Sequence, residues 1–346
     1  MRAFVVHKFL TINIIVLLGL MSCINEIKFN EQQMAPELVV NSLITPDSVI
    51  KLNLSLSRFF LSSEQNYTVI KNYEVKLWLN DMLKETMLNK SGTYVSVYKP
   101  KIGDYIKIII KNPENQKLTS CKTVIQKRIS ILSVDSSMTY ESSGYLTYND
   151  TLTSGFIKTD TLGQVRNFKF NFKTNFNDSL NFENYYRIVA TLVQYYAEGK
   201  TSNERLKLKP DDLVFEKMSE SGIFDNNKDK LFNIFRDDTF DGTHFGIKTF
   251  LYLKRISIRN ESITLFKLAG YKTPIKTEII FDLQSISPEF FKYLKSVKEN
   301  NTDLQYLSEP VQVYNNIYGG IGILGSYTHS FFKIALPIDS KTFYYQ

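Results

Sequence analysis

The segment Lys51-Leu52-Asn53-Leu54-Ser55-Leu56-Ser57 alternates strictly between polar and apolar side chains. Because successive side chains of a β-strand point to opposite faces, this period of two predicts a strand with its leucines on a buried face. The same alternation returns at 73–79, where one face carries Tyr73, Val75, Leu77 and Leu79. The chain is therefore expected to be built on β-strands.

Turn residues divide the first third of the chain into short strands. Gly92 precedes an apolar-rich strand predicted at 93–98, and Gly103 precedes another at 105–110. Short strands with turn signals about every 8–12 residues are typical of β-sandwiches. We therefore expect residues 36–127 to form an immunoglobulin-like β-sandwich.

The spacing of apolar residues loosens after residue 127. Phe168, Phe170 and Phe172 line one face of a predicted strand, and polar residues alternate with them. Residues 128–346 are therefore expected to form a second, larger β-rich domain. Its other predicted strands span 185–196, 247–256 and 275–283, and its polar stretches expected as long loops span 140–164 and 198–230.

One amphipathic helix is expected in this second domain. Ser287 is a candidate N-cap, and Pro288 suits the first helical position, where its missing N–H would have no partner. The apolar residues that follow at helical spacing are Phe290, Leu294 and Val297. Asn300-Asn301 ends the segment, and we expect the helix to pack on a sheet of its domain.

The first 22 residues have the three parts of a bacterial export signal. Arg2 and Lys8 supply positive charge, and residues 9–20 form an apolar run. A helix of that length spans about 18 Å, too short for a bilayer core of about 30 Å. Residues 1–22 are therefore expected to be a signal peptide that is removed.

The apolar run ends in Leu20-Met21-Ser22-Cys23, which resembles the lipobox of bacterial lipoproteins. The cysteine thiolate takes up a diacylglyceryl group, and the small Ser22 lets the peptidase reach the bond. Two or three acyl chains, such as palmitate, hold a protein stably where one chain is marginal. Cys23 is therefore the predicted lipidation site, and the polar residues 23–35 are the expected tether. Plain secretion and an uncleaved anchor are the alternatives.

Composition excludes several classes of protein. The 324 residues left after the signal peptide suggest two domains. The formal net charge is +7, but the lysines and arginines are scattered singly, so nucleic acid is not an expected partner. Cys121 is the only thiol besides Cys23, which leaves no pair for an intrachain disulfide. It lies in an apolar strand at 118–125 and is expected to be buried and inert.

The run Gly320-Ile321-Gly322-Ile323-Leu324-Gly325 has the glycine spacing of a dinucleotide-binding fingerprint. That fingerprint needs a helix after it and an acidic residue about 20 positions further on. Here residues 326–336 are β-like, and Asp339 is too close. No cofactor is expected, and glycines that permit a bend or bulge between strands are the favoured interpretation.

An acidic segment starts like a calcium-binding EF-hand loop at Asp225, Asn227 and Asp229. Lys230 stands where the loop needs glycine, and Arg236 stands where it needs a bidentate glutamate. A solvated acidic loop is favoured and no metal is expected. An irregular cation site stays open, and its further oxygen ligands would come from Asp237, Asp238 and Asp241.

No catalytic residue is assigned from the sequence. His244 and His329 are the histidines left after the signal peptide, and neither lies in an HExxH pattern. A histidine-based hydrolase, or a pair of carboxylates meeting in a cleft, stays an alternative. Trp78 lies on the polar register of its strand, where it is a contact hot spot, a sugar-stacking platform, or a side chain covered by the tether or the second domain.

Several segments taken together resemble one family. They are the Cys23 lipobox, residues 37–48, the strand at 73–79, Gly92-Thr93-Tyr94 followed by Gly103-Asp104-Tyr105, and residues 309–317 running into 320–323. In combination they resemble the Bacteroidota outer-membrane lipoproteins catalogued as domain of unknown function 4249. The resemblance covers nearly the whole chain after the signal peptide.

The resemblance implies an accessory role in nutrient uptake, because members are often found alongside TonB-dependent outer-membrane receptors. It brings no catalytic residues. The expected protein is thus a non-enzymatic lipoprotein, held to the outer membrane by lipid on Cys23, on the cell surface or the periplasmic face. One alternative is an extracytoplasmic hydrolase that acts on a polymer through carboxylates at the domain junction. The other is an adhesin or envelope-structural module.

Overall fold

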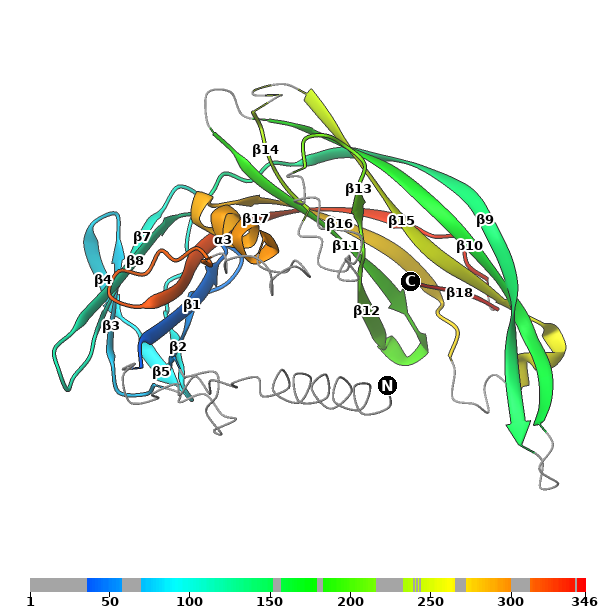
Figure 1. Cartoon of the computed structure of the whole chain (residues 1–346), viewed down its shortest axis with the longest axis horizontal. Coiled ribbons are helices and arrows are strands. Elements are labelled where there is room, and N and C mark those ends of the chain that lie inside the picture. Colours follow the sequence, from blue (N-terminus) through cyan, green and yellow to red (C-terminus); the bar gives the residue numbers. More distant parts are fainter. Residues whose placement is uncertain are drawn as a thin grey trace, which may run out of the picture. The chain divides into compact units, whose positions relative to one another are not determined.

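The computed structural model is mainly β, and its strands form three sheets (Figure 1). All described residues except Pro36 belong to one compact unit. In these ranges no helix has the length and apolar character needed to cross a membrane. The described residues are 36–57, 70–151, 157–178, 183–215, 233–238, 240, 242, 244–264, 272–299, 312–339 and 341–346. The predicted signal peptide, the predicted lipidation site Cys23 and the expected tether lie outside them.

The largest sheet joins segments from both ends of the chain. Its strands are β1 (Leu38–Ile44), β2 (Lys51–Leu56), β5 (Leu88–Lys90), β6 (Thr93–Val95), β11 (Tyr185–Tyr195), β12 (Thr201–Leu206), β14 (Ile234–Arg236), β16 (Lys276–Ile286) and β17 (Ile321–Ala335). Their order is β12-β11-β16-β17-β1-β2-β6-β5, with β14 pairing with β11. β1 and β17 are parallel neighbours, so the ranges 36–127 and 128–346 share this sheet. Their separation into two domains stays a prediction.

A four-stranded sheet packs against the β1, β2 and β6 part of the large sheet. Its strands are β3 (Glu74–Leu79), β4 (Met82–Thr86), β7 (Tyr105–Lys111) and β8 (Leu118–Val124), in the order β4-β3-β7-β8. Leu52, Leu54, Leu77 and Ile108 lie in the core between the two sheets. The alternation at 51–57 and 73–79 therefore marks buried faces as predicted, and the expected β-sandwich is present.

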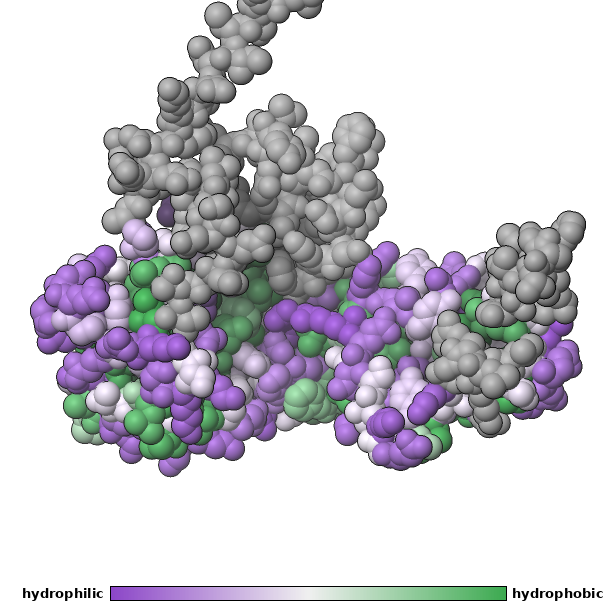
Figure 2. Space-filling view, turned by 90° about the horizontal axis from the view of Figure 1, so that it is seen from below, coloured by the Kyte–Doolittle hydropathy of each residue, from purple (hydrophilic) through white to green (hydrophobic). Residues whose placement is uncertain are grey.

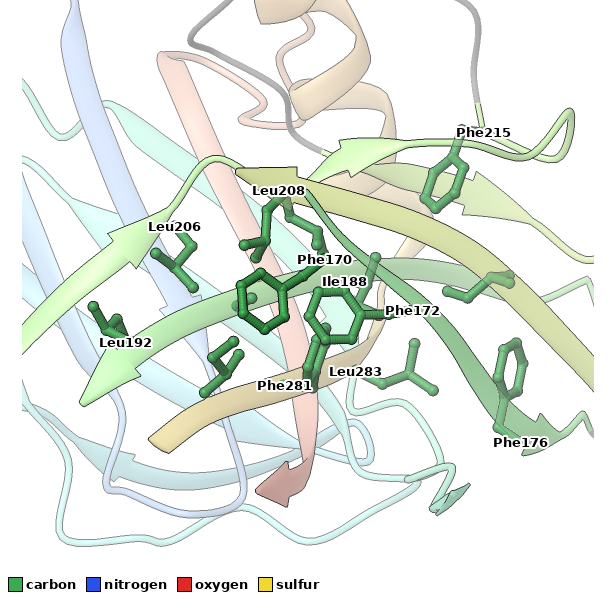
Figure 3. Close-up of a cluster of buried hydrophobic side chains, with 14 of the residues drawn as sticks. Phe170, Phe172, Phe176, Ile188, Leu192, Leu206, Leu208, Phe215, Phe281 and Leu283 are labelled. Carbon is green, nitrogen blue, oxygen red and sulfur yellow. The ribbon is translucent and has the colours of Figure 1, made fainter. Parts of the chain in front are cut away.

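A five-stranded sheet covers the β11 and β16 part of the large sheet. Its strands are β9 (Ile131–Thr151), β10 (Ile157–Asn177), β13 (Lys209–Pro210), β15 (His244–Ile258) and β18 (Thr342–Tyr345). β13, β15, β10 and β9 follow in that order, and β18 pairs with β15. The core between the sheets is rich in aromatic rings (Figure 3), and the ring centroids of Phe172 and Phe281 lie 4.8 Å apart, edge to face. Such ring pairs add about 0.5–1.5 kcal/mol to the stabilisation by burial.

The described part of the polar stretch at 140–164 is not a loop, contrary to the sequence-based prediction. Residues 140–151 and 157–164 belong to β9 and β10, which pair in an antiparallel hairpin. Residues 141–147 are mostly exposed, so backbone hydrogen bonds hold this ladder and no apolar alternation is needed. The stretch at 198–230 is only partly a loop, because β12 and β13 lie within it.

The predicted helix is α3 (Pro288–Glu299), and it packs on the large sheet. Phe290, Phe291 and Leu294 bury their side chains against Tyr185 of β11 and Ile286 of β16. The helix begins after Ser287, as predicted, whereas Asn300 and Asn301 lie outside the described residues. Among the described residues, short 3-10 turns are η2 (Ala197–Gly199) and η3 (Asn260–Ser262).

Replacing Ser287 by alanine is expected to cost about 1–2 kcal/mol of unfolding free energy. The Ser287 hydroxyl oxygen accepts hydrogen bonds from Phe290 N at 3.3 Å and from Ser326 N at 3.2 Å, so it ties the start of α3 to β17. Urea denaturation measures the loss. Lys292→Ala, at an exposed position of the same helix, is the control and is expected to change stability by less than about 0.5 kcal/mol. Equal losses in the two variants would contradict the capping role.

Candidate functional site

One face of the large sheet carries a cluster of polar side chains. Ile279, Phe281 and Leu283 of β16 point into the core between the large sheet and the five-stranded sheet. Asp282 and Gln284 therefore point to the opposite face of the large sheet. The strand pairing places Arg187 of β11 on one side of Gln284 and His329 of β17 on the other. We call this group the Asp282 cluster, and its members are Arg187, Arg205, Asp282, Gln284, Tyr327 and His329.

Asp282 is the centre of the cluster. Its Oδ2 atom accepts a hydrogen bond from Gln284 Nε2 at 2.6 Å and lies 2.7 Å from His329 Nδ1. Asp282 and Gln284 are each only 7% exposed, yet among the described residues Asp282 Oδ1 and Gln284 Oε1 have no hydrogen-bond partner. A buried acceptor left unpaired costs about 1–3 kcal/mol. Two such atoms on neighbouring side chains therefore indicate a place where a hydrogen-bond donor would be stabilised.

Two arginines bring positive charge to the same place. Within the described part of the chain, neither Arg187 nor Arg205 forms an ion pair or a side-chain hydrogen bond. The Arg187 guanidinium carbon lies 6.0 Å from the ring centroid of Phe290 in α3. Burial and, to a smaller extent, the charge of Arg205 lower the pKa of Arg187 to about 10, although the Asp282 carboxylate opposes both effects. The cluster thus combines two unpaired guanidinium groups with a single carboxylate.

His329 is held by its neighbours on β17 as well as by Asp282. Its ring meets Tyr327 edge to face at 4.8 Å and stacks on Phe331 at 5.0 Å. A carboxylate on Nδ1 orients an imidazole as in a general base, but among the described residues no hydroxyl or thiol hydrogen-bonds to this ring. His244 lies on β15 of another sheet, 3.1 Å from Asn177 Oδ1. The structure therefore does not bring the two histidines together.

Cys121 lies in β8 and is 4% exposed. Burial raises the pKa of its thiol to about 12, so the sulfur stays protonated at neutral pH. The sequence-based prediction of a buried, unreactive cysteine is confirmed.

Trp78 lies on the outer face of the four-stranded sheet, half-buried beside Lys107 of β7. Its Nε1 atom is buried and has no hydrogen-bond partner. Its cross-strand neighbour on β4 is Leu83, which is 52% exposed. On the molecular face seen in Figure 2, hydrophobic residues lie in separate patches among hydrophilic ones. A contact role for Trp78 stays a prediction.

The acidic segment is only partly described, because Asp225, Asn227, Asp229, Lys230 and Asp241 lie outside the described residues. Its later residues are engaged with the protein itself: Arg236 pairs with Asp238 at 2.9 Å, and buried Asp237 accepts two hydrogen bonds from Asn184, both at 2.9 Å. Across the ranges that the structure covers, no three acidic, histidine or cysteine side chains are grouped so as to hold a metal ion.

The glycine run at 320–325 leads into a strand and not into a helix, in agreement with the β-like pattern after it. Its glycines serve the close approach of β17 to β1. A Cβ atom on Gly322 would lie 2.1 Å from the Val40 carbonyl oxygen, and one on Gly320 would lie 2.6 Å from that of Leu38. The run is thus a packing feature of the sheet.

The sequence did not single out most of the Asp282 cluster. His329 was considered as a base, but Arg187, Arg205, Asp282, Gln284 and Tyr327 were not. One signal was available, because Asp282 and Gln284 interrupt the apolar run at 279–286. A charged residue inside a buried strand usually has a partner or a function.

These features define a β-sandwich protein that carries a polar cluster on the sheet face opposite its cores. The chain belongs to the family described as Domain of unknown function (DUF4249), which matches residues 24–331. No curated protein and no solved structure matches it.

Proposed function

We propose that the chain is a non-enzymatic lipoprotein of the Bacteroidota outer membrane that assists a TonB-dependent nutrient-uptake receptor. Lipid on Cys23 anchors it, and the β-sandwich body meets the receptor. The observation that carries this proposal is the position of the lipobox. The family match starts at residue 24, directly after Cys23, so the predicted signal peptide of residues 1–22 lies wholly outside the matched region.

Two further observations support a binding role. Cys121 is buried and the pKa of its thiol is raised, so this thiol does not supply the thiolate that a nucleophile needs. The Asp282 cluster presents unpaired donors and acceptors, which suit recognition of a polar group. The hydrolase and the adhesin stay alternatives, and no contact in the described residues favours either.

Co-purification tests the receptor partnership. The full chain, carrying an affinity tag after Gln346, is isolated from membranes of its own organism in mild detergent. We expect a TonB-dependent receptor to be recovered in comparable molar amount, and to be lost from the Cys23→Ala variant, which lacks the anchor. Recovery of the lipoprotein alone, at the mass of a single chain, would contradict the proposal.

A further inference from the structure

The Asp282 cluster offers unused hydrogen-bonding groups of both kinds. Asp282 Oδ1 and Gln284 Oε1 are acceptors without donors, and Arg187 Nε is a buried donor without an acceptor. A guanidinium has five N–H groups in a planar fork that matches a carboxylate. A ligand that satisfies the whole cluster must therefore carry an anionic acceptor and a hydrogen-bond donor on the same small molecule.

The charges of the cluster restrict this ligand further. Arg205 of β12 pairs with Thr191, which lies on the same face of β11 as Arg187. The charge of Asp282 acts on both arginines. A carboxylate between the two guanidinium groups relieves the repulsion between them. A phosphate dianion would bring a second negative charge next to Asp282. A protonated amine beside Asp282 gains a charge-assisted hydrogen bond instead.

We propose that the Asp282 cluster binds a small zwitterion with a carboxylate beside a protonated amine, of which a free α-amino acid is the common example. The carboxylate lies against Arg187 and Arg205. The amine donates to Asp282 Oδ1 and Gln284 Oε1. His329 and the Gln284 amide hold the Asp282 carboxylate in place through its other oxygen.

Ring contacts and strand pairing fix the positions of the side chains in the cluster. The Arg187 guanidinium faces the ring of Phe290, and the Phe290 ring centroid lies 6.2 Å from that of Tyr327. Tyr327 in turn meets His329 edge to face. Regular pairing of β16 with β11 and β17 fixes the spacing of the side chains that these strands carry. A site on paired strands is held more precisely than one on loops.

The melting temperature of the full mature chain in mild detergent tests this inference. The probes are the common L-amino acids, tested one by one. Acetate, ethylammonium and inorganic phosphate are the comparison probes. We expect at least one amino acid to raise the Tm, by about 4 °C at 100 times its Kd, and the comparison probes to have a much smaller effect.

Matched variants locate the binding. Arg205→Gln changes an exposed side chain of β12, so the fold is retained, and Asp282→Asn keeps the shape of its side chain while removing the charge. Both are expected to abolish the rise in Tm. Lys333→Ala, on an exposed β17 residue outside the cluster, is expected to keep it.

Three outcomes would overturn the inference. One is a Tm that no amino acid raises. Another is an equal rise with acetate or phosphate, which would indicate a simple anion site. The third is a rise that persists in Arg205→Gln, which would place the binding elsewhere. None of these outcomes bears on the receptor partnership, because the inference does not depend on it.

Discussion

Replacing Gly322 by alanine is expected to lower the free energy of unfolding by at least about 3 kcal/mol. Gly322 has a φ of 123°, which side-chain-bearing residues rarely adopt. A Cβ atom at this position would lie 2.1 Å from the Val40 carbonyl oxygen. This oxygen is a backbone atom of a paired strand, so it cannot move away as a flexible side chain could. The clash falls in the parallel β1–β17 ladder, which joins the two halves of the large sheet.

Gly144 provides the matched control for this substitution. It lies in β9, where an added Cβ would meet nothing within 4 Å. Gly144→Ala is therefore expected to change stability by less than about 1 kcal/mol. Chemical denaturation of both variants in the same detergent measures the difference. If Gly322→Ala proves as stable as Gly144→Ala, the close packing of β17 on β1 is not required for the fold.

Replacing Cys23 by alanine is expected to abolish lipid attachment. In the proposed lipoprotein the diacylglyceryl group joins the protein through this sulfur, and each buried CH₂ group contributes about 0.8 kcal/mol of membrane affinity. Cells that produce the protein are grown with labelled palmitate, and the label carried by the isolated protein measures the modification. The parent chain is expected to carry the label, and Cys23→Ala none.

Cys121→Ala is the control for the labelling experiment. Its sulfur is buried and protonated, so its loss is expected to leave the label unchanged. Label that persists in Cys23→Ala would show that acylation takes place at another residue. The predicted cleavage site after Ser22 would then lose its main support.

Local periodicity was sufficient to predict much of the fold. The alternation at 51–57 and at 168–172 marks buried faces because burial in a sandwich follows the same period of two. The Ser287-Pro288 start of α3 was readable because a helix N-terminus needs a cap. The β9–β10 pairing was not predicted, because residues 141–147 are mostly exposed and carry no apolar alternation.

Long-range pairing was beyond sequence reasoning. Val40 pairs with Gly322 across most of the chain, and no local signal tells a strand which partner it will meet. The Asp282 cluster depends on the same kind of information. Arg187, Gln284 and His329 are ordinary polar residues until the order β11-β16-β17 places them side by side. Predicting the site from the sequence would have required this strand order.

The proposed function depends most on a lipid attached to Cys23. Mass spectrometry of the protein isolated from membranes of its own organism tests this attachment directly. We expect an amino-terminal fragment that begins at Cys23 and carries the mass of a diacylglyceryl group. A chain that still begins at Met1, or a Cys23 with an unmodified thiol, would contradict it.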